Sequence, residues 1–333
     1  GLALALFSRP LAAALLNDAE LSAVLVWLGV SLIFVALNGL LLAILNGKKE
    51  IMLFVAITIA GSLIGLAITG ALTVAFGLEG ALIALSVNQA IVFLVTVAAC
   101  LRQSWFRLSM LVGAIDRGAV RELLKFTAMA LTSAVMGPVS QLFIRDHLIG
   151  EFGLADAGYW DALTRISMLY LTVVTVPLSI YYLPRLAEIR DMGELRREIL
   201  SGYRLIVPVT IIGALAMFLL RDLIIMILFT PDFAPMRDLF AWQMAGDVLK
   251  ISGWLLGYIL IARGMMKPFI ATEIAFGVSW YVLVRAFTPH FGLEGVQIAY
   301  AVNYLLYIVM LACILRAYLK RQTEHENPAP RGI

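Results

Sequence analysis

The feature that most constrains this chain is a series of long apolar stretches joined by short connections. Each stretch is about as long as the ~20 residues that a helix needs to cross a bilayer. Nine can be drawn: Leu21–Leu45, Ile51–Ala75, Gly80–Leu101, Glu122–Arg145, Tyr159–Leu183, Gly202–Leu220, Asp238–Ala262, Lys267–Phe287 and Glu294–Arg316. Only 14% of the 333 residues are charged and 62% are hydrophobic, whereas a soluble domain averages about 25% charged. The sequence therefore predicts an all-α polytopic membrane protein.

The basic residues are distributed unevenly between the two sides of the membrane that these spans define. Most of the 25 Lys and Arg residues fall in alternate connections, among them Lys48, Arg121, Arg196 and Lys267. Connections on the cytoplasmic side of membrane proteins show this excess. We therefore expect that side to be cytoplasmic, together with the C-terminus.

One short motif occurs twice in the chain. The sequence FGLEG at Phe76–Gly80 recurs at Phe291–Gly295, and Asn88 matches Asn303 in the same register. Matches in register across several spans indicate an internal duplication. The two copies would have the same orientation in the membrane, which makes this a parallel repeat. We therefore expect two six-helix bundles, with 12 spans in the intact protein.

The repeat also predicts how the chain is divided. Residues 1–101 would form the C-terminal half of a first bundle that is truncated at its N-terminus, with the stump of a span at 1–16. Residues 102–118 would form an amphipathic cytoplasmic linker. The second bundle would occupy 119–318, and 319–333 would be a cytoplasmic tail.

Two pairs of charged residues lie inside predicted spans. Asp247 and Lys250 are three residues apart, and Lys250 would lie about 16 Å deep at about 1.5 Å per residue. Asp161 precedes Arg165 by four residues, the favourable order on a helix. A charge at the bilayer centre costs at least ~2.5–3.5 kcal/mol and normally faces a cavity or a partner. Each pair is therefore either a self-neutralised packing pair or part of a substrate cavity.

The sequence contains no recognisable catalytic or metal-binding constellation. The histidines His147, His290 and His325 are far apart in the chain, and no HExxH pattern is present. The Gly47-Lys48 dipeptide lacks the first glycine and the final Ser or Thr of a phosphate-binding loop. We therefore expect a transporter without enzyme activity, and we expect no cofactor and no metal.

Several stretches resemble the Wzx-type polysaccharide flippases, in particular those for enterobacterial common antigen lipid III and related O-antigen units. The most specific stretch is MRDLFAWQMAGDVLK at 236–250, which is followed by GYILIA at 257–262. Lys125–Leu131, the Tyr182–Pro184 corner and Gly61–Gly65 also match. The family belongs to a superfamily of 12-span exporters that includes drug/cation antiporters and the lipid II flippase.

The resemblance implies a function in polysaccharide biosynthesis. Such a protein would translocate an undecaprenyl-diphosphate-linked oligosaccharide from the inner to the outer leaflet of the bacterial inner membrane by alternating access. Its partners would be this glycan lipid and the membrane lipids. The polysaccharide polymerase machinery stays open as a further partner, and no nucleic acid is expected.

The residues of a candidate site follow from the same resemblance and from the charges within spans. A diphosphate is attracted by cationic groups in a medium of low dielectric. The candidates to bind it are Lys250, Arg165 and Arg145. The candidates to hold these cations or to couple transport to an ion are Asp247, Asp161 and Glu273.

The sequence leaves other functions open. An ion-coupled drug or metabolite antiporter of the same superfamily is the alternative, and a buried acid would then bind cations. The excess of basic over isolated acidic groups in the spans argues against it. A membrane glycosyltransferase would need a large outer loop, and the longest one, Asp146–Gly158, is short. An inactive fragment also stays open.

Overall fold

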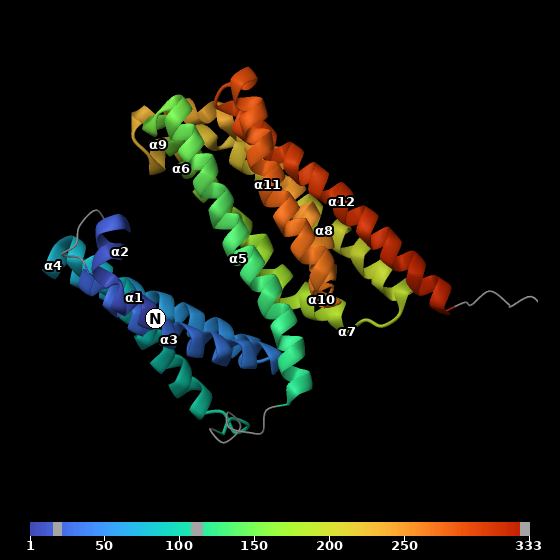
Figure 1. The fold of residues 1–333 in the computed structure, drawn as a ribbon, viewed down its shortest axis with the longest axis horizontal. Helices are drawn as coiled ribbons and strands as arrows, with labels where there is room; N and C mark the ends of the chain where they lie inside the picture. The colour runs from blue at the N-terminus through green and yellow to red at the C-terminus, as the bar shows by residue number, and fades with distance from the viewer. Residues whose placement is uncertain (16–21, 108–115, 327–333) are drawn as a thin grey trace, which may run out of the picture. The chain divides into compact units, whose positions relative to one another are not determined.

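The computed structural model describes residues 1–15, 22–107 and 116–326, and the regular elements within these ranges are helices (Figure 1). Eight helices in this described part are long and apolar enough to cross a membrane. Large apolar side chains such as Leu142, Val173 and Ile212 are exposed on these helices. Faces of this kind suit a lipid environment. The prediction of an all-α polytopic membrane protein is confirmed.

The chain forms two compact units, Gly1–Ile115 and Asp116–Ile333. The boundary falls inside the predicted linker 102–118, of which residues 108–115 lie outside the described part. Residues 327–333 of the predicted tail lie outside it as well, and the preceding residues of that tail continue the last helix. The division into two bundles of six helices stays a prediction.

The first unit contains the predicted stump and three predicted spans. The stump region forms two short helices, α1 (Leu2–Leu6) and α2 (Ser8–Leu15), and α3 (Ser22–Gly47) follows. Two predicted spans, Ile51–Ala75 and Gly80–Leu101, fall within the single element α4 (Ile51–Leu101), which has a non-helical residue at Gly77.

The repeated motif forms the same type of corner in both units. Gly77 has φ 60° and ψ −137°, and its counterpart Gly292 has φ 59° and ψ −144°. These left-handed conformations favour glycine. A Cβ on Gly80 would lie 2.0 Å from a carbonyl oxygen of the preceding helix, and a Cβ on Gly295 would lie 2.8 Å from one. Both glycines of the motif are therefore required by the backbone, and the shared geometry supports the predicted duplication.

The second unit contains the remaining helices and positions the site. Its elements are α5 (Arg117–Phe152), α6 (Leu154–Pro177), the π-helix η3 (Leu178–Tyr182), α7 (Leu183–Glu188), α8 (Met192–Leu219), α9 (Arg221–Leu228), η4 (Pro231–Leu239), α10 (Phe240–Ala262), α11 (Met266–Phe291) and α12 (Glu294–Glu326). Capping residues lie at both ends of α5, with Asp116 at its N-cap and Gly153 at its C-cap. Asp116 accepts a hydrogen bond from the Gly118 N–H at 2.8 Å, and Gly153 (φ 91°) separates α5 from α6.

Helix α10 is the central element of the second unit. In the span Pro231–Ala262, half of the residues of the most apolar segment are buried. The corresponding share is 17% in the spans formed by α5 and α8. Helix α10 packs against α12, α8 and α7, and α12 packs in turn against α11 (Figure 1). Glycines on α10 allow this approach, since a Cβ on Gly253 would lie 3.0 Å from the Tyr307 ring. Small residues at contacts between membrane helices let the two backbones approach closely.

Candidate functional site

The second unit contains a cavity of about 520 Å³ between α5, α6, α10, α11 and α12. This volume is within the range of small-molecule sites, which are mostly apolar and contain a few placed polar groups. The polar lining residues include Ser133, Gln141, Thr164, Gln243, Lys250 and Glu273.

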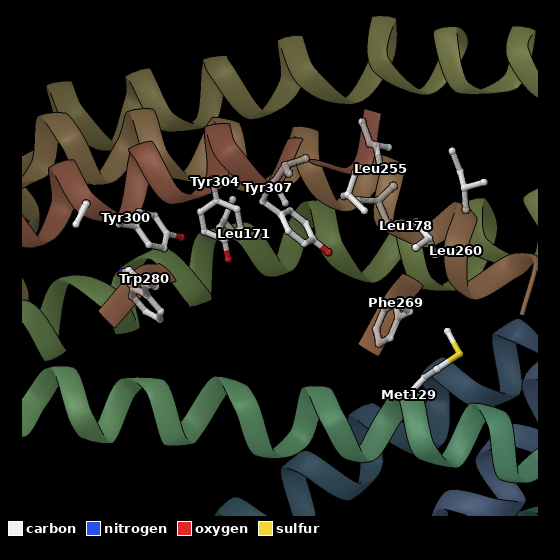
Figure 2. Close-up of a cluster of buried hydrophobic side chains, with 14 of the residues drawn as sticks. Met129, Leu171, Leu178, Leu255, Leu260, Phe269, Trp280, Tyr300, Tyr304 and Tyr307 are labelled. Atoms are coloured by element: carbon white, nitrogen blue, oxygen red, sulfur yellow. The ribbon is translucent and has the colours of Figure 1, made fainter. Parts of the chain in front are cut away.

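Aromatic rings form one wall of the cavity. Tyr300, Tyr304 and Tyr307 are spaced so that they share one face of α12, and Figure 2 shows them in a row along this helix. Phe276 and Trp280 of α11 pack against them, with ring centroids 4.7 Å apart for Phe276–Tyr304 and 5.7 Å apart for Trp280–Tyr300. Such contacts stabilise the wall and fix the orientation of its rings.

The carboxylate of Asp247 lies behind this wall and is fully buried. It accepts hydrogen bonds from the Tyr170 hydroxyl at 2.9 Å, the Tyr300 hydroxyl at 2.9 Å and the Gln243 amide at 3.2 Å. Tyr300 and Gln243 line the cavity themselves. Asp247 therefore joins α6, α10 and α12 and holds two lining side chains in place.

Lys250 lines the cavity. The ion pairs among the described residues do not include one between Lys250 and Asp247. The Nζ of Lys250 lies 5.2 Å from the ring centroid of Trp254, one turn further along α10. Three other donors hold the oxygens of Asp247, and the attraction between Asp247 and Lys250 acts over a longer distance. The two side chains of the self-neutralised pair, one of two alternatives that the spacing allowed, are therefore not in direct contact.

Glu273 of α11 also lines the cavity. Its carboxylate accepts hydrogen bonds from the Ser133 hydroxyl at 2.9 Å and from the Tyr307 hydroxyl at 3.4 Å. The cavity thus contains a carboxylate on one helix and an ammonium on another. An arrangement of this kind can bind an anionic group and respond to a bound cation or proton.

The remaining three candidates lie outside the cavity lining. Arg145 of α5 pairs with Asp161 of α6, with 3.3 Å between Nη1 and Oδ2. The spacing of Asp161 and Arg165 favoured a pair within α6, but the structure pairs Asp161 with the neighbouring helix instead. Arg165 is exposed, although its neighbours Thr164 and Ser167 line the cavity.

Several residues of the site were not singled out from the sequence. They include Tyr170, Gln243, Trp254 and the tyrosines of α12. The tyrosines at 300, 304 and 307 have helical spacing, which was a usable signal for a shared face. Tyr170 gave no such signal, because only the folded chain brings it to Asp247.

Comparison with known proteins places this architecture in a family. Residues 1–238 match the family described as polysaccharide biosynthesis protein. The lipid III flippase of Escherichia coli is 30% identical over 287 residues, which is 86% of this chain and 69% of that protein.

Solved structures with the same fold come from transporters. A MATE protein in complex with MaL6 superposes with a TM-score of 0.84 at 13% identity, covering 97% of this chain and 77% of that one. The lipid II flippase MurJ in an inward closed conformation gives 0.68 at 14% identity, covering 95% and 69%. These likenesses concern the fold alone. The family match and the flippase relative confirm the resemblance stated from the sequence: the chain belongs to the polysaccharide biosynthesis protein family of membrane proteins.

Proposed function

We propose that this protein moves an undecaprenyl-diphosphate-linked oligosaccharide from the inner to the outer leaflet of the bacterial inner membrane. The observation that supports this most directly is the Lys250 ammonium, which lines a cavity between membrane-spanning helices without an ion-pairing carboxylate among the described residues. The 30% identity to a lipid III flippase supports the same function. We further propose a cytoplasmic C-terminus, from the distribution of basic residues.

The physical argument concerns the diphosphate. Its charges must leave water while the lipid crosses, and this step is costly unless cationic groups accompany them. An ammonium in a medium of low dielectric attracts such an anion much more strongly than it would in water. Among the described residues, Lys250 is the cation on the cavity wall. In alternating access the cavity would open first to one side of the membrane and then to the other.

Replacing Lys250 by glutamine is expected to lower export at least about tenfold, a change equivalent to ~1.4 kcal/mol. The complete protein is expressed in a bacterium that lacks its own lipid III and O-unit flippases. Surface glycan and the lipid-linked intermediate are then quantified. Wild type should restore glycan and clear the intermediate, and Lys250→Arg should retain part of the export.

Lys125→Gln provides the matched control, because Lys125 pairs with Glu122 at 2.6 Å on α5 and does not line the cavity. This variant should export normally. Full export by Lys250→Gln would show that Lys250 has no part in binding the diphosphate.

Glu273 is proposed to couple export to an ion. It is the only carboxylate among the described residues that line the cavity. Glu273→Gln keeps the shape of the side chain and an oxygen acceptor for Ser133 or Tyr307, but it removes the charge. Export is expected to fall about tenfold while the purified protein still binds the lipid. Undiminished export by this variant would exclude the coupling role.

Glu273 lies in a cavity lined by aromatic rings, and carboxylates and aromatic rings both attract cations. This supports a second candidate function, an antiporter for organic cations. In that case the cells would accumulate the intermediate and become resistant to cationic dyes. Glu273→Gln would abolish the resistance, and Lys250→Gln would leave it intact. That pattern would replace the flippase proposal.

A further inference from the structure

Lys250 and Trp254 form an ammonium–indole pair on the cavity wall. They lie four residues apart on α10, so they share one face of the helix, and both line the cavity. We propose that this pair binds the junction between the diphosphate and the first sugar of the lipid-linked glycan. The inference rests on the proposed function and assigns the part of the substrate that this site contacts.

Trp254 is less involved in core packing than the other tryptophan of the cavity. Trp280 is only 6% exposed, and its ring contacts Phe276 and Tyr300. Trp254 is half-buried and has no ring–ring contact among the described residues. Its near neighbour is the Lys250 ammonium, 5.2 Å from the ring centroid. Although Trp254 also packs against the hydrophobic core, part of its indole surface lines the cavity and can contact a molecule there.

Lys250 is available as well. Asp247, the nearest acid along the helix, is bound by Tyr170, Tyr300 and Gln243 behind the wall. Besides the longer-range attraction of Asp247, the ammonium has a cation–π contact with Trp254, which is weaker than its attraction to a phosphate in the same low-dielectric cavity. A phosphate would draw the ammonium from the ring on its flexible stem, and the movement would uncover the indole face.

The chemistry of the junction matches this pair. The phosphate is bonded directly to the anomeric carbon of the first sugar, so an anion and a pyranose ring are adjacent. The ammonium can donate to a phosphate oxygen. The indole can pack against the C–H face of the sugar, and its N–H can donate to a hydroxyl group. Residues one helical turn apart, about 5.4 Å, provide both contacts together.

Binding measurements with two lipids test the proposal. The complete protein is purified, and its affinity is measured for undecaprenyl diphosphate and for undecaprenyl diphosphate bearing one N-acetylglucosamine. Wild type should bind the sugar-bearing lipid more tightly. Trp254→Leu should weaken binding of that lipid about tenfold and leave binding of bare diphosphate unchanged, whereas Lys250→Gln should weaken both about tenfold. Trp254→Phe should lie between wild type and Trp254→Leu.

Trp242→Leu is the matched control, because Trp242 lies on the same helix, is 43% exposed and does not line the cavity. It should bind both lipids like wild type. Retained binding of bare diphosphate also shows that Trp254→Leu is folded. Equal affinity of wild type for the two lipids, or an equal loss on both in Trp254→Leu, would overturn the inference but not the flippase function. No binding of either lipid by wild type would contradict the proposed function itself.

Discussion

Replacing Gly246 by alanine is expected to destabilise the second unit by about 1–3 kcal/mol and to abolish most export. The added Cβ would lie 2.3 Å from Cδ1 of Tyr300 and 3.4 Å from the backbone of Ala301. The Tyr300 ring has little freedom to move, because it is buried, packs against Trp280 and donates a hydrogen bond to Asp247. Either α10 and α12 separate or the tyrosine leaves the cavity wall.

The measurement is the melting temperature of the purified protein, together with surface glycan in the complemented cells. A unit of this size should lose about 2–4 °C for each kcal/mol. Gly150→Ala on α5 is the control, since a Cβ there meets nothing within 4 Å. That variant should melt at or above the wild-type temperature, because alanine favours helix over glycine.

A second substitution separates the clash from other effects of Gly246→Ala. Tyr300→Ala removes the ring that the new methyl group would meet, so the double variant should lose less stability than the two single changes together. Purely additive losses would show that Gly246 and Tyr300 do not contact one another as the structure has them.

The broad fold was predictable because it depends on local properties of the sequence. Runs of apolar residues near the length of a membrane span predicted the helices, and the repeated FGLEG motif marked two corners. The glycines explain this success, since the positive φ angles of Gly77 and Gly292 exclude most other residues. What was missed is also local: the stump region forms two helices, α1 and α2, in place of one.

The partners of the buried charges were not predictable, because they lie on other helices. Spacing showed only that Lys250 shares a helix face with Asp247 and that Arg165 shares one with Asp161. Spacing does not show which groups compete for the same carboxylate. Tyrosine hydroxyls from α6 and α12 occupy Asp247, and Arg145 from α5 pairs with Asp161. A contact between distant segments follows from the packing of whole helices, which the charge pattern of one helix does not specify.

Asp247→Ala is expected to have the second large effect, with loss of export and a marked fall in melting temperature. The substitution leaves the hydroxyls of Tyr170 and Tyr300 and the amide of Gln243 without their acceptor. A buried donor that loses its partner costs about 1–3 kcal/mol. The effect should exceed that of Asp238→Ala, a matched change at an exposed acid in η4. Melting temperature and surface glycan are measured as for Gly246→Ala.

Removing the donors together with the acceptor decides whether the hydrogen bonds are the cause. In the triple variant Asp247→Ala, Tyr170→Phe and Tyr300→Phe, most unpartnered donors are gone, so the melting temperature should recover towards wild type. Export should stay low if transport needs the Tyr300 hydroxyl at the cavity wall. A triple variant that melts no higher than Asp247→Ala would mean that the packing volume of Asp247, and not its hydrogen bonds, joins the three helices. Recovery of both stability and export would show instead that the carboxylate serves only to satisfy these donors, which would leave Lys250 and Glu273 as the charged groups that transport requires.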